Sequence, residues 1–382
     1  MKNNYFFSQV HQVFFTLAFV NAIVFMLTFM LSYKGIFSLQ VDVVLFHAVS
    51  LIFLVFTPAL LGFLFTTFPR FLSYAAINKQ NYLSAFTLFT LASIILIIGA
   101  FKSALLFKIS IVLLLISLSY ATYILFDIYK KSTMEDKHDT TYILVGFFAG
   151  ILSLIVFISE FHNHLAIQIA VFNFLFVVSF SVAQRMIPFF SHVMPQRIET
   201  FLRNIVLLLV LHTLLEAFKP NISYVVDLIL SILIAKEIYR YKLPFPNKNA
   251  MITILHVALF WIPIAFFISF ISKALILFNN NIFLALDIHA LLLGFLFTVL
   301  IGFGTRVTIG HSGNMMVATP YIKFLFAFTQ VVVLIRLAVS IVASFGYNYM
   351  IIFDISVTMW LLMFIFWLYK FFTVLVFGKK LN

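Results

Sequence analysis

The sequence predicts an all-α fold, a polytopic transmembrane bundle of about twelve helices that forms a single transmembrane domain over residues 1–382. Apolar residues make up 64% of the chain and charged residues only 9%, whereas a soluble domain carries about 25% charged residues. Apolar runs long enough to cross the hydrocarbon core, which takes roughly 20 residues, recur along the whole length. The short alternating segments of an outer-membrane barrel are absent, so helices must satisfy the backbone within lipid.

The apolar runs and the turn or charge signals between them define the individual helices. We expect helices, in chain order, at residues 13–33, 44–68, 82–101, 107–129, 141–159, 165–188, 201–219, 222–239, 251–271, 283–304, 322–343 and 350–377. Among the breaks are Lys34-Gly35 and Pro220-Asn221. The first run is not followed by an Ala-x-Ala-like cleavage site, so we do not expect a cleaved signal peptide.

Lysine and arginine residues are distributed unequally between the two sides of these helices. One side holds six of the 24, namely Lys34, Lys102, Lys108, Lys219, Lys273 and Arg336, and the other side, with both termini, holds the remaining 18. Cytoplasmic loops of membrane proteins are enriched in Lys and Arg. We therefore expect a multi-pass protein of the bacterial inner membrane with both termini in the cytoplasm.

The charge and the missing cysteines exclude some classes of function. The net charge of +12 is explained by topology and by attraction to anionic lipid. Because no basic patch interleaved with aromatic residues lies on a soluble element, we expect the lipid bilayer and no nucleic acid as a partner. The chain has no cysteine, which excludes disulfides, Fe–S clusters and thiolate ligands. Any metal must therefore be held by His, Met, Asp or Glu.

The second, sixth and tenth helices suggest an internal repeat. Each of them has histidine at its outer end and arginine at its inner end, and the second and tenth also share the string Gly-Phe-Leu-Phe-Thr, at 62–66 and 294–298. One hypothesis is three four-helix units, at 1–135, 136–250 and 251–382. The alternative is coincidence among ten histidines.

Histidines at matched depth are candidate haem ligands, because neutral imidazole is a common ligand of metals and haem iron. His47 and His289 lie at the outer ends of the second and tenth helices and could bind one iron from two sides. The alternative is an interfacial histidine bonded to a carbonyl or water. Arg185 and Arg306 could pair with haem propionates, since guanidinium matches carboxylate geometry; the alternative is ordinary anchoring at the inner face.

Four further histidines are candidate metal ligands. His11, His256 and His311 lie near the inner face, and His212 lies in the middle of the seventh helix. Glu216 follows His212 at i+4, so both side chains lie on the same side of the helix. This pair could be a buried hydrogen-bonded pair, a proton relay or a metal site.

Three strings carry a resemblance to a known family. They are Arg185-Met-Ile-Pro-Phe-Phe190, His256-Val-Ala-Leu-Phe-Trp-Ile-Pro263, and His289-Ala leading to Thr305-Arg-Val-Thr-Ile-Gly-His-Ser-Gly313. Together with His11-Gln-Val-Phe-Phe15 and the run from His47 to Pro69, they make the chain resemble the NnrS family over nearly its whole length. The chain departs from the family at 47–51, where it reads His-Ala-Val-Ser-Leu. The family usually has His-Ala-His-Glu-Met at that place.

The resemblance implies a twelve-helix bacterial inner-membrane protein that contains haem and copper and handles nitric oxide or protects against nitrosative stress. It leaves open a redox activity like that of a nitric oxide reductase, with an electron donor that the sequence does not identify. The residues missing from the second helix put the copper in doubt. A looser likeness to the main subunit of haem–copper oxidases is an analogy of fold and helix number.

Two other functions are compatible with the sequence. A transporter or channel for a small solute or metal complex would have broken helices around a polar site, and Pro58 and Pro263 lie within expected helices. A non-catalytic accessory or sensory membrane protein would bind without turnover.

Overall fold

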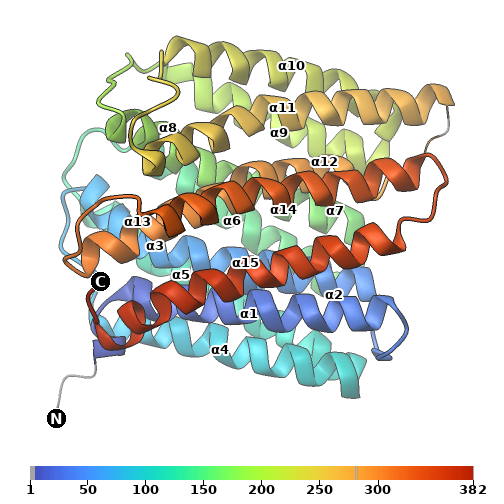
Figure 1. Ribbon diagram of the computed structural model, residues 1–382, viewed down its shortest axis with the longest axis horizontal. Helices are drawn as coiled ribbons and strands as arrows, with labels where there is room; N and C mark the ends of the chain where they lie inside the picture. Colours follow the sequence, from blue (N-terminus) through green and yellow to red (C-terminus); the bar gives the residue numbers. More distant parts are fainter. Residues whose placement is uncertain (1–4, 280, 282, 382) are drawn as a thin grey trace. The chain divides into compact units, whose positions relative to one another are not determined.

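The computed structural model describes residues 5–279, 281 and 283–381, and these residues contain helices but no strand. After a short 3₁₀ turn, η1 (Tyr5–Phe7), they form continuous helices at the twelve expected places (Figure 1). In chain order, the elements are α1 (Val10–Tyr33), α2 (Val43–Ser50) with η2 (Leu51–Phe56) and α3 (Thr57–Phe71), α4 (Lys79–Lys102), α5 (Ala104–Lys131), α6 (His138–Ser159), α7 (Asn163–Gln168) with η3 (Ile169–Phe176) and α8 (Val177–Phe190), α9 (Glu199–Phe218), α10 (Pro220–Arg240), α11 (Ala250–Asn279), α12 (Leu286–His289) with η4 (Ala290–Phe297) and α13 (Thr298–His311), α14 (Pro320–Ser344) and α15 (Met350–Phe377).

Eleven of these helices are long and apolar enough to span a membrane, within the described part of the chain. The exception is α10, whose apolar stretch is interrupted by Asp227 and ends in a charged turn with Lys236, Glu237 and Arg240. The prediction of a helical, multi-pass membrane protein is therefore confirmed. Lys2, one of the 18 basic residues expected on the side of the termini, and Asn280, in the expected break before residue 283, lie outside the described residues.

Two helices end well after the residues at which the sequence predicts their ends. Helix α11 continues to Asn279, and the helix expected at 283–304 continues to His311. Helix α13 runs on through Arg306 to His311 although it contains Gly302, Gly304 and Gly310, which are poor helix formers. That helix stops where Gly313 adopts a positive φ of 69°, a conformation in which glycine is favoured. His311 is thus a helical residue.

The chain divides into two compact units. The first comprises residues 1–170, 307–315 and 364–382, and the second comprises residues 171–306 and 316–363. Within the first unit, α4 lies alongside α5; within the second, α10 lies alongside α11 (Figure 1). The four-helix repeat units that the sequence suggests stay a prediction.

The second, sixth and tenth helices differ from the others in burial and in backbone geometry. Within their most apolar stretches, 89%, 89% and 78% of residues are buried, compared with 28–56% in the other candidate spans. Each of the three contains a π-helical segment, η2, η3 or η4, and these are the π-helical segments among the described residues. Such segments are rare and frequently lie at functional sites. The shared Gly-Phe-Leu-Phe-Thr strings have different registers, because 62–66 follows η2 whereas 294–298 begins inside η4.

A π-helical turn disturbs the regular backbone hydrogen bonds, and in lipid every backbone group needs a partner. Side chains supply partners here. The Thr57 hydroxyl donates to the Ile52 carbonyl at 2.8 Å, and the Thr298 hydroxyl donates to the Leu293 carbonyl at 3.1 Å. Both bonds reach back five residues and are buried. Threonine at the end of η2 and η4 thus stabilises the wider turn.

Asn21 of α1 provides a test of the η2 segment. Its amide donates to the Leu54 carbonyl at 2.8 Å and to the Ser93 hydroxyl of α4 at 2.9 Å, both buried. Leucine in place of Asn21 leaves the Leu54 carbonyl without this donor, and an unsatisfied buried polar group costs about 1–3 kcal/mol. We expect Asn21→Leu to lower the melting temperature of purified protein, whereas Thr90→Val, at a part-buried hydroxyl bonded within its own helix, should change it little. Equal melting temperatures for Asn21→Leu and wild type would contradict this role.

Candidate functional site

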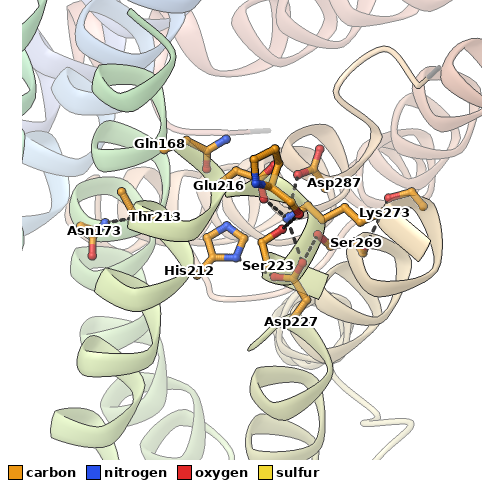
Figure 2. Close-up of polar contacts among 12 residues, drawn as sticks. Gln168, Asn173, His212, Thr213, Glu216, Ser223, Asp227, Ser269, Lys273 and Asp287 are labelled. Carbon is orange, nitrogen blue, oxygen red and sulfur yellow. Dashed lines mark hydrogen bonds and ion pairs between the residues drawn. The ribbon is translucent and has the colours of Figure 1, made fainter. Parts of the chain in front are cut away.

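A group of ionisable side chains is buried in the second unit, where α9, α10, α11 and α12 meet (Figure 2). We call it the buried charge cluster. Its members are His212, Glu216, Asp227, Lys273 and Asp287. An ionisable residue within a membrane segment is costly and is usually functional or paired. The cluster is therefore the first candidate site.

Lys273 lies at the centre of the cluster. Its Nζ atom lies 2.5 Å from Glu216, 2.8 Å from Asp227 and 3.8 Å from Asp287. The exposed fraction of the Lys273 side chain is 8%. Because one ammonium faces carboxylates from three different helices, Lys273 joins α9, α10 and α12 to its own helix, α11.

Asp227 is completely buried and has several partners. Its Oδ2 atom accepts hydrogen bonds from Lys273 and from the Ser269 hydroxyl, both at 2.8 Å. Its Oδ1 atom lies 2.7 Å from Nδ1 of His212, which is also completely buried. A buried carboxylate is tolerated only when it is paired and hydrogen-bonded, and these three partners meet that requirement.

The sequence identified two members of the cluster and missed three. His212 and Glu216 share a side of α9, as their spacing predicts, but each has a different partner, Asp227 for the imidazole and Lys273 for the carboxylate. Asp227, Lys273 and Asp287 were not singled out. A charged residue within an apolar run is the sequence feature that could have identified these three residues. The count of Lys and Arg residues instead placed Lys273 in a loop on the side opposite the termini.

His289 ends the short helix α12, two residues after Asp287 of the cluster. Its Nδ1 atom lies 2.7 Å from the Ala285 carbonyl oxygen and 3.1 Å from Nη2 of Arg336 on α14. The imidazole is half-buried. The sequence identified His289 as a candidate haem ligand but treated Arg336 only as a charge on the outer side.

His47 has a similar position in the first unit. It lies in α2, one turn before the π-helical segment η2. Its ring stacks on Phe29 of α1, with the ring centroids 4.1 Å apart and the planes 29° apart. His47 and His289 belong to different units, so the prediction that they bind one iron together stays a prediction.

Two of the inner-face histidines come together in the first unit. The ring centroids of His11, on α1, and His311, at the end of α13, lie 4.8 Å apart. His11 is only 3% exposed. The third, His256, is completely buried in the second unit, where its Nε2 atom lies 2.7 Å from the Ser191 hydroxyl. Among the described residues, no three His, Cys, Asp or Glu side chains are arranged to hold a metal ion.

The two candidate arginines lie at the far ends of their helices. Arg306 of α13 lies over the ring of Phe190, with its guanidinium carbon 4.1 Å from the ring centroid, a cation–π contact. At about 1.5 Å per residue, Arg306 is roughly 25 Å along the helix from His289. The pairing of Arg185 and Arg306 with haem propionates stays a prediction. Arg185 lies near the end of α8.

Comparison with known proteins gives one result. The family model described as NnrS protein matches residues 5–377. No curated protein matches the chain.

Proposed function

The chain belongs to the NnrS family, and on that premise we propose that it is a haem-binding membrane protein that handles nitric oxide or protects against nitrosative stress. Membership and the helical architecture support a multi-pass protein in a lipid bilayer. We further propose the bacterial inner membrane, with both termini in the cytoplasm. That orientation rests on the unequal distribution of Lys and Arg.

One observation carries the haem assignment, namely the environment of His289. A metal-ligating histidine nearly always donates its other ring N–H to a carbonyl, carboxylate or water. The Nδ1 atom of His289 has such an acceptor in the Ala285 carbonyl, 2.7 Å away. This arrangement suits ligation through Nε2, and the described residues around His289 therefore fit a haem ligand.

The residues of the chain would hold and orient the haem, which when bound would supply an iron atom with affinity for nitric oxide. His289 would hold the iron from the second unit. His47, which lies one turn before η2 in the first unit, is the second candidate ligand. The bilayer would supply the gas, because nitric oxide is a small apolar molecule that dissolves in lipid.

Copper fits the described residues less well than haem does. His11 and His311 offer two imidazoles, but no third His, Cys, Asp or Glu among the described residues completes a metal site with them. The segment 47–51 also lacks the second His and the Glu that the family pattern has there. Copper therefore enters no step of this proposal.

The haem proposal predicts the spectra of three variants. Wild-type protein expressed with added haem should show a Soret band after purification, and His289→Ala and His47→Ala should each change that band because an iron ligand is lost. His138→Ala is the control, since His138 lies at the start of α6. A purified protein without a Soret band would overturn the proposal. Solute flux into liposomes by such a haem-free protein would support the transporter instead.

Consumption of nitric oxide distinguishes turnover from binding. Protein reconstituted in liposomes with an added reductant would consume nitric oxide continuously if it is a reductase. A single stoichiometric uptake would indicate sequestration or sensing.

A further inference from the structure

Arg336 has a position that neither the family membership nor the sequence pattern explains. We propose that Arg336 is a positioning residue for His289: it controls which ring nitrogen of His289 is available to haem iron, and its charge raises the reduction potential of that iron. This inference rests on the proposed function, since it takes His289 as a ligand.

The two neighbours of Nδ1 in His289 make opposite demands on it. The Ala285 carbonyl, at 2.7 Å, can only accept a hydrogen bond, whereas the Arg336 guanidinium, at 3.1 Å, can only donate one. If Nδ1 carries the hydrogen, it donates to Ala285 and Nε2 keeps the lone pair that binds a metal. If Nδ1 accepts from Arg336, the hydrogen is on Nε2, and that nitrogen cannot bind a metal.

Arg336 is held so that it can serve both states of His289. Its Nη1 atom donates to the Ser340 hydroxyl at 2.8 Å, and its Nη2 atom donates to the Leu284 carbonyl at 3.1 Å. The Ser340 hydroxyl donates to the same carbonyl at 2.9 Å. In the tautomer in which Nδ1 of His289 carries the hydrogen and donates to Ala285, Nη2 of Arg336 keeps the Leu284 carbonyl as its acceptor. The guanidinium therefore stays in place whether or not His289 binds iron.

The charge of Arg336 has a consequence for bound iron. The usual partner of a ligating histidine is an acceptor, which makes the imidazole a stronger electron donor. The guanidinium of Arg336 acts in the opposite direction through its permanent positive charge, because in the iron-binding state Nδ1 donates to Ala285 and no longer accepts from Arg336. That nearby charge favours ferrous over ferric iron, since the surroundings of a ligating histidine set the potential of haem.

The ion pair between Asp287 and Lys273 joins the short helix α12, which carries His289, to α11. Asp287 and His289 both belong to α12, and Asp287 lies 3.8 Å from Lys273 of α11. Arg336 reaches α12 from α14. The short helix that carries His289 is thus contacted by a cationic side chain from each of two neighbouring helices. Because these contacts hold the backbone of α12 in place, Arg336 decides which ring nitrogen of His289 carries the hydrogen and which can bind iron.

The test measures haem-loaded protein in lipid nanodiscs by spectroelectrochemical titration. Arg336→Gln should lower the midpoint potential of the haem because the positive charge is lost, and it should tighten haem binding severalfold because the shorter, uncharged amide competes less for Nδ1. Arg336→Lys keeps the charge and should retain most of the wild-type potential. The matched control is Arg240→Gln, whose guanidinium bonds Glu237 and the Gln196 carbonyl; it should leave the potential unchanged.

The outcomes separate this inference from the proposed function. If His289→Ala changes the haem spectrum but Arg336→Gln leaves the midpoint potential and the haem affinity at wild-type values, the inference is overturned and the haem proposal stands. If His289→Ala leaves the spectrum unchanged, the ligand assignment fails, and the inference fails with it. Should Arg336→Gln not fold, Ser340→Ala keeps the arginine but removes one of its hydrogen-bond partners besides His289. That variant should then lower the potential by a smaller amount, and an unchanged potential would count against the inference.

Discussion

Replacing Lys273 with methionine is expected to abolish most of the folded protein. The substitution keeps an unbranched side chain, one atom shorter, but removes the ammonium that faces Glu216, Asp227 and Asp287. Removing one partner of a buried ion pair leaves an uncompensated buried charge and destabilises by about 3–5 kcal/mol. Here three carboxylates lose their shared cation at once. We expect a large fall in the yield of monodisperse protein and in its melting temperature, both measured by fluorescence-detected size-exclusion chromatography.

Two further variants separate charge from packing in that result. Lys108→Met is the control, because Lys108 and its partner Glu160 are exposed to 42% and 69%. Exposed pairs contribute about 0–1 kcal/mol, so this variant should behave like wild type. The double variant Lys273→Met with Asp227→Asn should recover part of the lost stability, because it removes a buried negative charge together with the positive one. A Lys273→Met protein as stable as Lys108→Met would show that the cluster does not hold the helices together.

The number and places of the helices could be predicted from sequence because length and apolarity fix a membrane helix. The same features explain the difference at α10: Asp227 and the charged last turn leave it without an apolar stretch as long as those of the other eleven helices. The π-helical segments could not be predicted. Leu51–Phe56 and Ala290–Phe297 are uniformly apolar, and no residue type in them distinguishes a π turn from an α turn.

The candidate site was only partly predictable, because its members come from separate helices. His212 and Glu216 were found together since they lie one turn apart on α9. Asp227 and Lys273 are distant from them in sequence, and no local pattern states which helix faces which. The same reason hid Arg336, whose contact with His289 joins α14 to α12. A charge near the end of an apolar run reads equally well as an anchor at the membrane surface.

Replacing Gly99 with alanine is expected to have the second large effect. A Cβ atom at Gly99 of α4 would lie 2.4 Å from the backbone nitrogen of Phe107 and 2.7 Å from the carbonyl carbon of Leu106, both on α5. Small residues let membrane helices approach closely, and in this place the neighbouring atoms are backbone. A side chain could turn away from an added methyl group, but a helix backbone must move as a whole.

The connection between α4 and α5 makes that movement costly. Only Ser103 separates the two helices, and its amide bonds the Gly99 carbonyl at 2.9 Å, so the helices cannot part near this end without breaking the turn. Overpacking usually costs about 1–3 kcal/mol, and we expect Gly99→Ala to reach or exceed the upper end, measured as a lower melting temperature of the purified protein. Ile98→Ala is the control, because Ile98 is the neighbouring residue of α4 and is 47% exposed. If Gly99→Ala and Ile98→Ala have the same melting temperature, α4 and α5 do not pack as closely as the distances at Gly99 require.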